Sequence, residues 1–206
     1  MENIVNNVNT FYTGGFVRDL ILYKPAYLRK ISQSIYHLSF DDISNTSLPI
    51  SDIDISTSLD PKSVAKLIDL HFPNCNRVRQ FATNKFDYNG KRYEITSTRI
   101  DYDCDGRNAK MKFSASFYRD SFRRDFTFNA LYMRKDGIIF DFHNGIEHLQ
   151  RGEIRFIGDA ATRIREDYTR IKRYYDFSKR LGIRNYEIEQ TIDYIMKNST
   201  EPIIMR

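Results

Sequence analysis

The sequence has few cysteines and no long apolar run. Only two of its 206 residues are cysteines, Cys75 and Cys104. Two thiols can build neither a disulfide framework nor a four-ligand zinc site, so we expect free thiols in a reducing compartment such as the cytoplasm. No stretch approaches the roughly 18 apolar residues of a membrane-spanning helix. The first residues also lack the basic and apolar regions of a secretory signal, so neither a membrane span nor secretion is expected.

Charge is unevenly distributed along the chain. Hydrophobic residues make up 41% of it, which is enough for a packed core in one domain, or in one domain with a small second one. The net charge is +5, and residues 123–184 account for all of it, with 11 Arg and 3 Lys against 6 Asp and 3 Glu. A localised excess of arginine favours phosphate-rich partners such as nucleotides and RNA. A solvated helical face would have the same composition.

The hydrophobic pattern predicts a mixed α/β segment over about residues 1–158 and an all-helical segment over 159–206. Leu28, Ile31, Ile35 and Leu38 recur at helical spacing, which predicts a helix inserted within residues 24–50. Residues 101–116 predict a loop. Strands are expected at 11–13, 53–57, 78–82, 92–98, 138–142 and 154–157, and helices at 17–23, 61–71, 121–133, 160–181 and 186–197.

Two carboxylates alternate with isoleucines in Asp52-Ile53-Asp54-Ile55. Residues two apart on a strand share a face, so Asp52 and Asp54 point the same way. Such a pair repels unless a cation neutralises it, and Mg²⁺ binds through one or two carboxylates plus substrate phosphates. Glu94 lies in another alternating strand and would complete a three-carboxylate cluster, suited to two-metal phosphoryl transfer, if the two strands are neighbours. The alternative is a polar edge strand that faces solvent.

Two segments carry groups that can bind a nucleotide. Gly14-Gly15 lies between an expected strand and an expected helix, where backbone amides can approach a phosphate, and Arg18 follows one turn later. The two arginines of Arg123-Arg124-Asp125 can bind a triphosphate. Asp125 can hold an arginine or meet a sugar hydroxyl, which Asn129 can also reach. An ordinary turn and a helix N-terminus with surface charges are the alternatives.

The Arg-rich helix offers both hydrogen-bond acceptors and donors on one face. Glu166 and Arg170 are four residues apart, and Asp167, Arg170 and Arg173 follow one another at intervals of three. Aspartate can accept from a cytosine amino group and arginine can donate to base acceptors. Intrahelical salt bridges, worth a few tenths of a kcal/mol each, are the alternative.

In this order, the motifs closely resemble those of the class II tRNA nucleotidyltransferase and bacterial poly(A) polymerase family. The sequence contains Gly-Gly-x-Val-Arg-Asp, Asp-x-Asp, Arg-Arg-Asp-Phe-Thr-x-Asn-Ala and Glu-Asp-x-x-Arg-x-x-Arg. Segments 93–99, 105–109 and 152–159 resemble the family's third-carboxylate strand, flexible loop and head–neck junction. The resemblance implies an α+β fold, with a polymerase-β-like nucleotidyltransferase head containing a mixed sheet at 1–158 and an all-helical neck at 159–206.

The resemblance also implies an activity and a set of site residues. The enzyme would add CCA to the tRNA 3′ end from CTP and ATP, without a nucleic-acid template, by attack of the 3′-hydroxyl on the α-phosphate with release of pyrophosphate. Asp52 and Asp54 would hold Mg²⁺, and Glu94 would assist the metal site or the activation of the 3′-hydroxyl. The implied nucleotide-binding residues are Gly14, Gly15 and Arg18 for the triphosphate, Arg124, Asp125 and Asn129 for triphosphate and ribose, and Asp167 and Arg170 for base selection, with Glu166 and Arg173 supporting them.

Several alternatives stay open. The same signature residues suit addition of CC only, of A only or of a poly(A) tail, and a catalytically inactive RNA-binding module also fits the fold. Family members usually continue into body and tail domains, so we expect either a truncated chain or a reduced enzyme that recognises only the acceptor end. Lys24, Arg29 and Lys30 suggest that segment 24–50 contacts RNA, and ordinary surface packing of this segment is the alternative. The sequence leaves the oligomeric state undetermined.

Overall fold

The computed structural model describes residues 10–39, 52–80, 82–105, 109–199 and 203. Short strands make up much of this part of the chain. They are β1 (Thr10–Thr13), β2 (Leu28–Ser32), β3 (Ile35–Leu38), β4 (Asp52–Thr57), β5 (Val78–Gln80), β6 (Thr83–Tyr88), β7 (Lys91–Ser97), β8 (Arg99–Tyr102), β9 (Lys110–Phe113), β10 (Leu131–Met133) and β11 (Ile138–Asp141).

The helices fall into two groups along the sequence. Some are interspersed with the strands, and three follow one another at the C-terminal end. They are α2 (Gly14–Tyr23), α3 (Pro61–His71), α4 (Phe117–Ser121), α5 (Gly145–Gln150), α6 (Ala160–Glu166), α7 (Thr169–Leu181) and α8 (Tyr186–Asn198), with 3-10 turns η1 (Pro25–Tyr27) and η2 (Thr127–Asn129). In the described residues, no helix is both long and apolar enough to cross a membrane.

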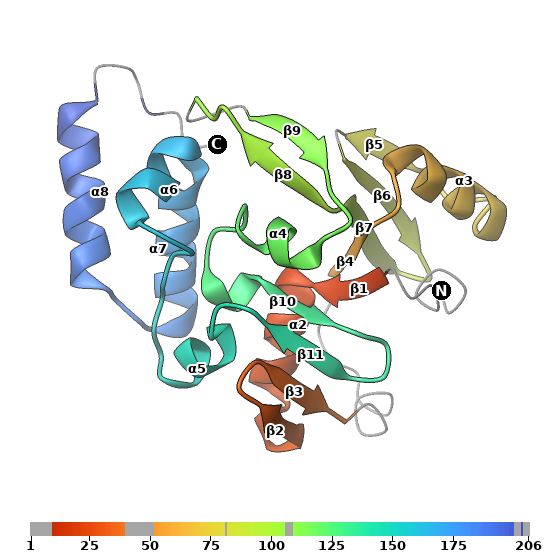
Figure 1. The fold of residues 1–206 in the computed structure, drawn as a ribbon, viewed down its shortest axis with the longest axis horizontal. Helices are drawn as coiled ribbons and strands as arrows, with labels where there is room; N and C mark the ends of the chain where they lie inside the picture. Colours follow the sequence, from red (N-terminus) through yellow and green to blue (C-terminus); the bar gives the residue numbers. More distant parts are fainter. Residues whose placement is uncertain (1–9, 40–51, 81, 106–108, 200–202, 204–206) are drawn as a thin grey trace.

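A nine-stranded mixed sheet organises the described residues, in the order β2-β3-β11-β10-β1-β4-β7-β6-β5. Strands β4 and β7 pair in parallel, whereas the other neighbours are antiparallel. Figure 1 shows α6, α7 and α8 side by side at one end of the molecule and α3 at the other. A second sheet, the β8–β9 hairpin, lies between these ends. The expected mixed sheet followed by a helical segment is therefore present.

The helix predicted within residues 24–50 is wrong where the structure describes it. Leu28–Ser32 and Ile35–Leu38 form a hairpin that adds β3 to the edge of β11. Tyr36 and Leu38 are buried on that hairpin, whereas Ile31 is 58% exposed. The backbone groups of β11 need partners, and pairing with them outweighs the helical spacing of the apolar residues. Residues 40–50 lie outside the described residues.

The helix predicted at 121–133 is also wrong. Helix α4 ends at Ser121, and the chain passes through η2 into β10, which pairs with both β1 and β11. Phe126 and Phe128 are completely buried in the turns between α4 and β10. The strand predicted at 154–157 is reduced to a single bridge between Phe126 and Phe156. Residues 126–133 are mostly apolar because they lie in the core. A buried strand and a buried helix have the same apolar composition, so composition does not distinguish them.

Two further predictions need correction. The segment 101–116, expected to be a loop, contains part of β8 and all of β9, although residues 106–108 lie outside the described part of the chain. The single helix expected at 160–181 is divided into α6 and α7 at Asp167 and Tyr168. The Asp167 carboxylate accepts hydrogen bonds from the backbone and hydroxyl of Thr169, which starts a new helix. The predicted end at Gly182 is confirmed by its left-handed conformation, with φ of 67°.

The hydrophobic core continues from the sheet into the C-terminal helices. Val17 of α2 and Phe128 belong to the same buried cluster as Ile171 and Tyr174 of α7 and Ile188 of α8. A second, smaller cluster packs α3 against the buried face of β4 and β7. Because apolar residues of both segments are buried together, the helical segment is held rigidly against the sheet.

Candidate functional site

The two carboxylates predicted to share a face lie at the start of β4. Ile53 and Ile55 are buried beneath α3, and Asp54 is half-buried on the opposite face. The neighbouring strand is β7, as the sequence predicts, and Asp54 is the direct register partner of Glu94. Asp52 lies next to Arg92 in the same register and is exposed. The parallel pairing of β4 and β7 therefore places Glu94 directly beside Asp54 on the neighbouring strand.

Asp54 carries a negative charge that its surroundings compensate poorly. Burial raises the pKa of its carboxyl above the ordinary value, and the nearby charge of Glu94 raises it further. The Arg124 guanidinium and the backbone N–H groups of Gly15 and Phe16 oppose this rise in pKa without cancelling it. Oδ2 of Asp54 accepts the hydrogen bond of the Gly15 N–H over 3.0 Å. A divalent cation fits such a site because it would offset the charge.

Glu94 is turned toward a lysine. Its Oε1 accepts from Lys85 Nζ at 2.7 Å, across the antiparallel β6–β7 pair. In the parts of the chain that the structure describes, no three His, Cys, Asp or Glu residues are grouped closely enough to hold a metal ion together. The predicted three-carboxylate cluster is therefore not assembled. The carboxylates available to bind a cation here are Asp52 and Asp54 on β4 and Glu94 on β7.

The Gly14-Gly15 turn has no room for side chains. Gly14 has φ of +61°, and a Cβ on it would lie 3.0 Å from Asp54 Oδ2. A Cβ on Gly15 would lie 3.3 Å from the same oxygen. The helix begins here and not at Val17 as predicted, so the first free N–H groups of α2 point at the carboxylate. The turn thus presents an anion-binding helix terminus beside Asp54.

Arg18 and Asn129 are buried together behind this turn. The Arg18 guanidinium donates to Asn129 Oδ1 at 2.7 Å and to Asp19 at 2.8 Å, and its plane lies 4.7 Å from the Phe177 ring centre. Asn129 in turn donates to Asp125 Oδ1 at 3.1 Å. The other oxygen of Asp125 pairs with Arg173 of α7 at 2.6 Å. One connected chain of polar contacts therefore links four of the predicted residues, Arg18, Asn129, Asp125 and Arg173.

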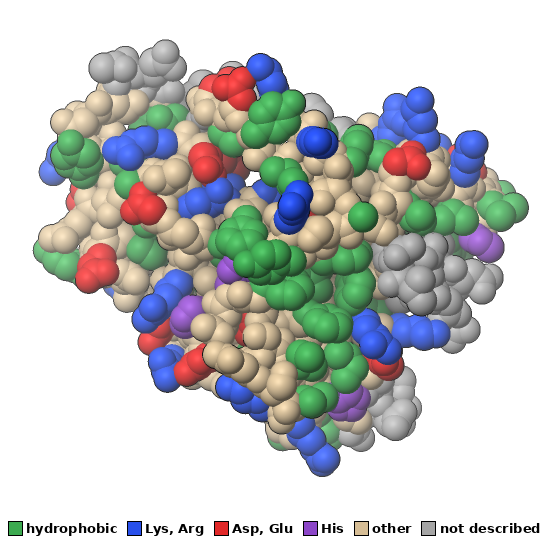
Figure 2. Space-filling view, viewed as in Figure 1, with side chains coloured by type: hydrophobic (Ala, Val, Ile, Leu, Met, Phe, Trp, Pro, Cys, Tyr) green, Lys and Arg blue, Asp and Glu red, His purple; other side chains and the backbone are tan. Residues whose placement is uncertain are grey.

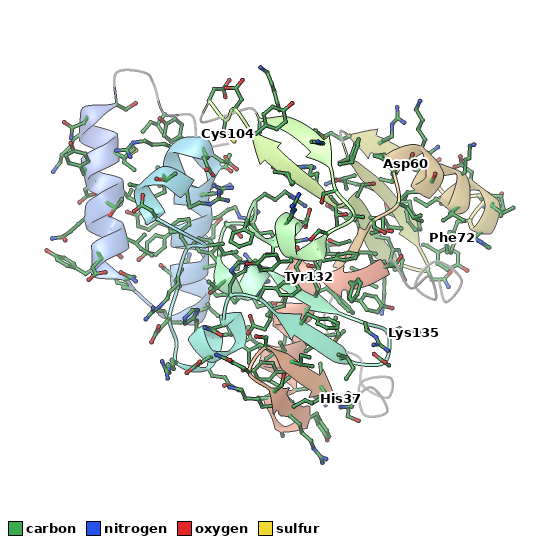
Figure 3. All side chains as sticks on the ribbon, viewed as in Figure 1. His37, Asp60, Phe72, Cys104, Tyr132 and Lys135 are labelled. Atoms are coloured by element: carbon green, nitrogen blue, oxygen red, sulfur yellow. The ribbon has the colours of Figure 1, made fainter. Side chains whose placement is uncertain are left out.

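Arg124 is held by four groups from four elements of the fold, β10, β4, η2 and α4. It donates to the Tyr132 hydroxyl at 2.9 Å, to Ser56 Oγ at 2.9 Å and to the Asn129 carbonyl oxygen, with Asp120 at 3.4 Å. Figure 3 shows Tyr132 beside α4, at the centre of the molecule. This network fixes the guanidinium against the sheet face that carries Asp54.

Sequence reasoning missed Asp120, which organises these arginines. Its fully buried carboxylate accepts from Arg123 at 2.7 Å, from the Tyr132 hydroxyl at 2.8 Å and from the Arg99 N–H at 2.9 Å. The two arginine charges hold its pKa below the ordinary value, despite burial, which acts in the other direction. A signal was present in the sequence, since Asp120 precedes the arginine pair by three and four residues on a short helix.

The C-terminal helices contribute the residues predicted to select the base. Arg170 donates to Glu166 at 3.0 Å, as expected, and also to the carbonyl oxygens of Arg163 at 2.6 Å and Arg123 at 2.9 Å. Arg163, which the sequence reasoning did not single out, donates to the same Arg123 carbonyl at 2.8 Å and to that of Arg124 at 2.9 Å. Its ion pair with Glu166 joins the two arginines. Both guanidiniums thus connect the helices to the backbone at 123–124.

Two adjoining cavities connect these groups. One cavity, of about 460 Å³, is bordered by Gly14, Gly15, Asp54 and Glu94. It is also bordered by Arg18, Arg123, Arg124 and Asp125. Asp167, Arg170 and Arg173 line its other side, but Glu166 and the exposed Asp52 do not belong to its lining. The second, of about 390 Å³, lies between the β8–β9 hairpin and α6 and includes Glu166, Asp167 and Arg170. Figure 3 shows Cys104 where that hairpin approaches α6.

A family model matches most of the chain. The model described as "Poly A polymerase head domain" matches residues 10–155. Human "CCA tRNA nucleotidyltransferase 1, mitochondrial" is 36% identical over 152 residues, covering 72% of this chain and 35% of the human protein. The "CCA-adding enzyme" of Bacillus cytotoxicus is 33% identical over 189 residues, covering 91% of this chain and 40% of that enzyme. The chain thus spans well under half the length of these relatives.

Solved structures with the same fold extend over nearly the whole chain. The Bacillus stearothermophilus CCA-adding enzyme in complex with CTP is 32% identical, with a TM-score of 0.66 over 92% of this chain and 39% of its own. An apo form of a CCA-adding enzyme is 25% identical, with a TM-score of 0.68 over 95% of this chain and 42% of its own. These matches confirm the α+β polymerase head fold predicted from the motifs.

Proposed function

The chain belongs to the poly A polymerase head domain family, and from this premise we propose that it transfers nucleotides to the 3′ end of RNA. The proposed reaction is addition of CCA to tRNA from CTP and ATP, the activity stated in the names of its relatives. The 3′-hydroxyl attacks the α-phosphate and pyrophosphate leaves. The observation that carries the proposal is a single polar cavity containing Asp54, Glu94 and Arg124 together with Asp167 and Arg170.

The proposed division of labour follows the two segments of the chain. Residues 1–158 form the catalytic head, and residues 159–206 form the neck that selects the nucleotide. The continuous core between them supports this assignment, because selection and chemistry require the two parts to keep a fixed relative position.

The triphosphate is bound by the head. The N–H groups of Gly15 and Phe16 face the Asp54 carboxylate at the start of α2, and phosphate oxygens held by the Gly14-Gly15 turn would compete with it there. Arg18 supplies positive charge one turn later. Arg124 adds a guanidinium whose orientation Tyr132 and Asp120 already fix, so little reorganisation is needed when charge develops on the phosphates.

Asp52 and Asp54 would hold the divalent cation, which we propose to be Mg²⁺. Such an ion, when bound, supplies positive charge to the triphosphate and to the attacking oxygen. The raised pKa of Asp54 supports this role, since a carboxylate with uncompensated charge favours a bound cation. Glu94 lies beside Asp54 in register, and we assign it the positioning of the 3′-hydroxyl.

Base selection belongs to the neck. Asp167 and Arg170 border both cavities and present an acceptor and donors to the base edge. Glu166 orients Arg170 through its ion pair. Asp125 and Asn129 meet the ribose, and Arg173 supports them through its ion pair with Asp125.

The test uses tRNA transcripts ending before CCA, after C and after CC. Each is incubated with the purified chain, Mg²⁺ and labelled CTP, ATP, UTP or GTP, and products are resolved to single nucleotides. Growth by CCA followed by arrest supports the proposal. Asp54→Ala and Asp52→Ala should each abolish incorporation while RNA binding persists. Asp87→Ala, an exposed aspartate on the β6–β7 hairpin, is the matched control and should keep full activity.

Other outcomes reassign the activity. Addition of C only, of A only or of an unbounded A tract would change the named reaction and leave the cation site intact. Absence of incorporation with tRNA still bound would favour an RNA-binding module that lacks catalysis. Sedimentation of the same preparation gives the oligomeric state.

We also propose that the chain works in a reducing compartment such as the cytoplasm. Cys75 and Cys104 are both free thiols, which supports this location. Mitochondrial relatives make the mitochondrial matrix the alternative. Immunoblotting of cell fractions distinguishes the two.

A further inference from the structure

The sheet face that carries Asp54 continues into a band of aromatic side chains. Asp54 and Ser56 share that face of β4, and Phe11 of β1 is the register partner of Ser56. Further along the sheet, Phe140 of β11 is the partner of Tyr132. We define the aromatic band as Phe11, Phe117, Tyr118, Phe122, Phe140 and Phe142.

The opposite face of the same strands is already buried. Leu131 and Met133 alternate with Tyr132 on β10, and Ile139 precedes Phe140 on β11. All three aliphatic residues belong to the buried cluster that contains Val17 and Leu20 of α2. The band therefore does not form the floor of this core. It lies on the outward side of the sheet, where α4 is placed.

The rings of the band touch one another in sequence. Ring centres are 5.0 Å apart for Tyr118 and Phe122 and 5.4 Å apart for Tyr118 and Phe142. They are 6.4 Å apart for Phe142 and Phe140, and 5.8 Å for Phe140 and Phe11. Figure 2 shows an unbroken hydrophobic surface over α4, β10 and β11. A contiguous exposed apolar surface of this kind is typical of an interaction site.

The end of the band nearest the active site is the most open. Tyr118 is 53% exposed and Phe122 is 47% exposed, whereas the other four rings are partly buried. Phe122 and the adjacent Arg119 also line the cavity that contains Asp167 and Arg170. A ligand on the band would thus reach the base-selecting residues without leaving the protein surface.

The chemistry of the band favours single-stranded RNA over a protein partner. Its members are all phenylalanine or tyrosine, and any base can stack on such rings. Arg119 follows Tyr118 in the sequence and lines the same cavity as Phe122, and among the described residues its guanidinium has no ion-pair partner. It is therefore available to a phosphate. Aromatic side chains interleaved with free positive charge are typical of sites that hold unpaired nucleotides.

We propose that the aromatic band binds the unpaired nucleotides that precede the RNA 3′ end. Bases stack on Tyr118 and Phe122, and Arg119 neutralises a phosphate between them. This inference rests on the proposed function, because it takes the 3′ end to lie at Asp54. It adds a substrate contact outside the nucleotide-binding motifs.

The test measures binding, not turnover. A 5′-fluorescein 12-nucleotide RNA of mixed sequence ending in CC is titrated with the chain, and a blunt hairpin RNA of equal length is titrated in parallel. The double variant Tyr118→Ala, Phe122→Ala should weaken single-strand affinity by about tenfold or more, since the two lost base stacks together contribute at least that factor. Hairpin affinity should stay within about twofold. Arg119→Gln should lower the slope of log K against log salt by about 1.

Two controls separate stacking from folding. Tyr186→Ala, Tyr194→Ala removes two exposed rings from α8 and should leave single-strand affinity unchanged. Tyr118→Trp, Phe122→Trp keeps stacking surfaces and should retain wild-type affinity. Wild-type affinity in the double alanine variant overturns the proposal. A wild-type dimer that this variant converts to a monomer, with RNA affinity unchanged, also overturns it and assigns the band to a second copy of the chain.

Failure of the proposed function gives a different result. If the wild-type chain incorporates no nucleotide but its single-strand affinity still depends on the two rings, the band stands as an RNA site and the catalytic assignment falls. If the wild-type chain incorporates nucleotides but its single-strand affinity does not depend on the two rings, the catalytic assignment stands and the band is not an RNA site.

Discussion

The backbone N–H of Gly15 donates to Oδ2 of Asp54 over 3.0 Å, so the start of α2 is bonded to a proposed cation ligand. The bond joins two motifs that lie 39 residues apart in the sequence. The Asp54 carboxylate is half-buried, and burial and the charge of Glu94 raise its pKa. The site is therefore arranged for ligands at the expense of its own stability.

Asp54→Asn should stabilise the chain while abolishing incorporation. Because the folded-state pKa of Asp54 is raised, ionisation of Asp54 disfavours the folded state. The stability gain should therefore be present at neutral pH and vanish as the pH falls below the ordinary value of 3.8. A gain of about 1 kcal/mol corresponds to roughly 2–4 °C in the melting temperature. Thermal melts of both proteins at several pH values check this.

The same two proteins test the cation site without any turnover. Mg²⁺ should raise the melting temperature of the wild-type chain in a concentration-dependent way, because a ligand that binds only the folded state stabilises it. Asp54→Asn should lose most of that increase. An equal increase in both would mean that the ion binds elsewhere.

Arg170→Ala should relax nucleotide choice more than it weakens RNA binding. The variant loses the donors proposed to face the base, and it also loses three hydrogen bonds to Glu166, Arg163 and Arg123. We expect the ratio of kcat/KM for CTP over UTP to fall by about tenfold or more, equivalent to about 1.4 kcal/mol. Arg165→Ala, an exposed arginine on α6, is the matched control. Unchanged selectivity in Arg170→Ala would show that Arg170 only holds the structure together and does not select the base.

Asp120→Asn should destabilise the fold strongly. The change leaves Arg123 and Arg124 buried without their shared carboxylate, and breaking such a buried pair costs about 3–5 kcal/mol. Asp136→Asn removes a carboxylate whose ion pair with Arg134 is exposed, and it should change stability by less than about 0.5 kcal/mol. Urea unfolding of both variants measures the difference. Similar midpoints would show that Tyr132 and the backbone alone hold the arginines.

Gly145→Ala should prevent stable folding at elevated temperature. A Cβ at this position would overlap the Thr127 carbonyl group, which is backbone and cannot move aside. We expect a loss of more than about 3 kcal/mol. Gly90→Ala is the control, because nothing lies within 4 Å of the Cβ position of Gly90, although its φ is +73°. It should lose only about 1–2 kcal/mol, the energy of the left-handed conformation.

Local sequence signals predicted the parts of the fold that depend on local chemistry. The Asp60 side chain accepts from the N–H groups of Lys62 and Ser63, which starts α3 where expected. The alternation around Asp54 predicted both the strand and its buried face. Glu166 and Arg170 pair as their spacing indicates.

Two of the errors share one physical cause. The apolar residues of 28–38 recur at helical spacing and those of 126–133 form a run, and in both segments the conformation is decided by partners far away in the sequence. Strand β11 determines the first, and β1 together with β11 determines the second. No local pattern could predict these pairings. The coordinating role of Asp120 depends likewise on Tyr132, which only the sheet brings near.

Helices α6 and α7 contact residues 123–124 through backbone carbonyl oxygens, and this has an evolutionary consequence. Arg163 and Arg170 donate to groups that every amino acid possesses. Mutations can therefore alter the side chains at 123 and 124 without releasing the helices. Docking of these helices and the chemistry of the arginine pair are open to selection as separate traits, so descendants of this chain can change the side chains proposed to bind the triphosphate while keeping the same architecture.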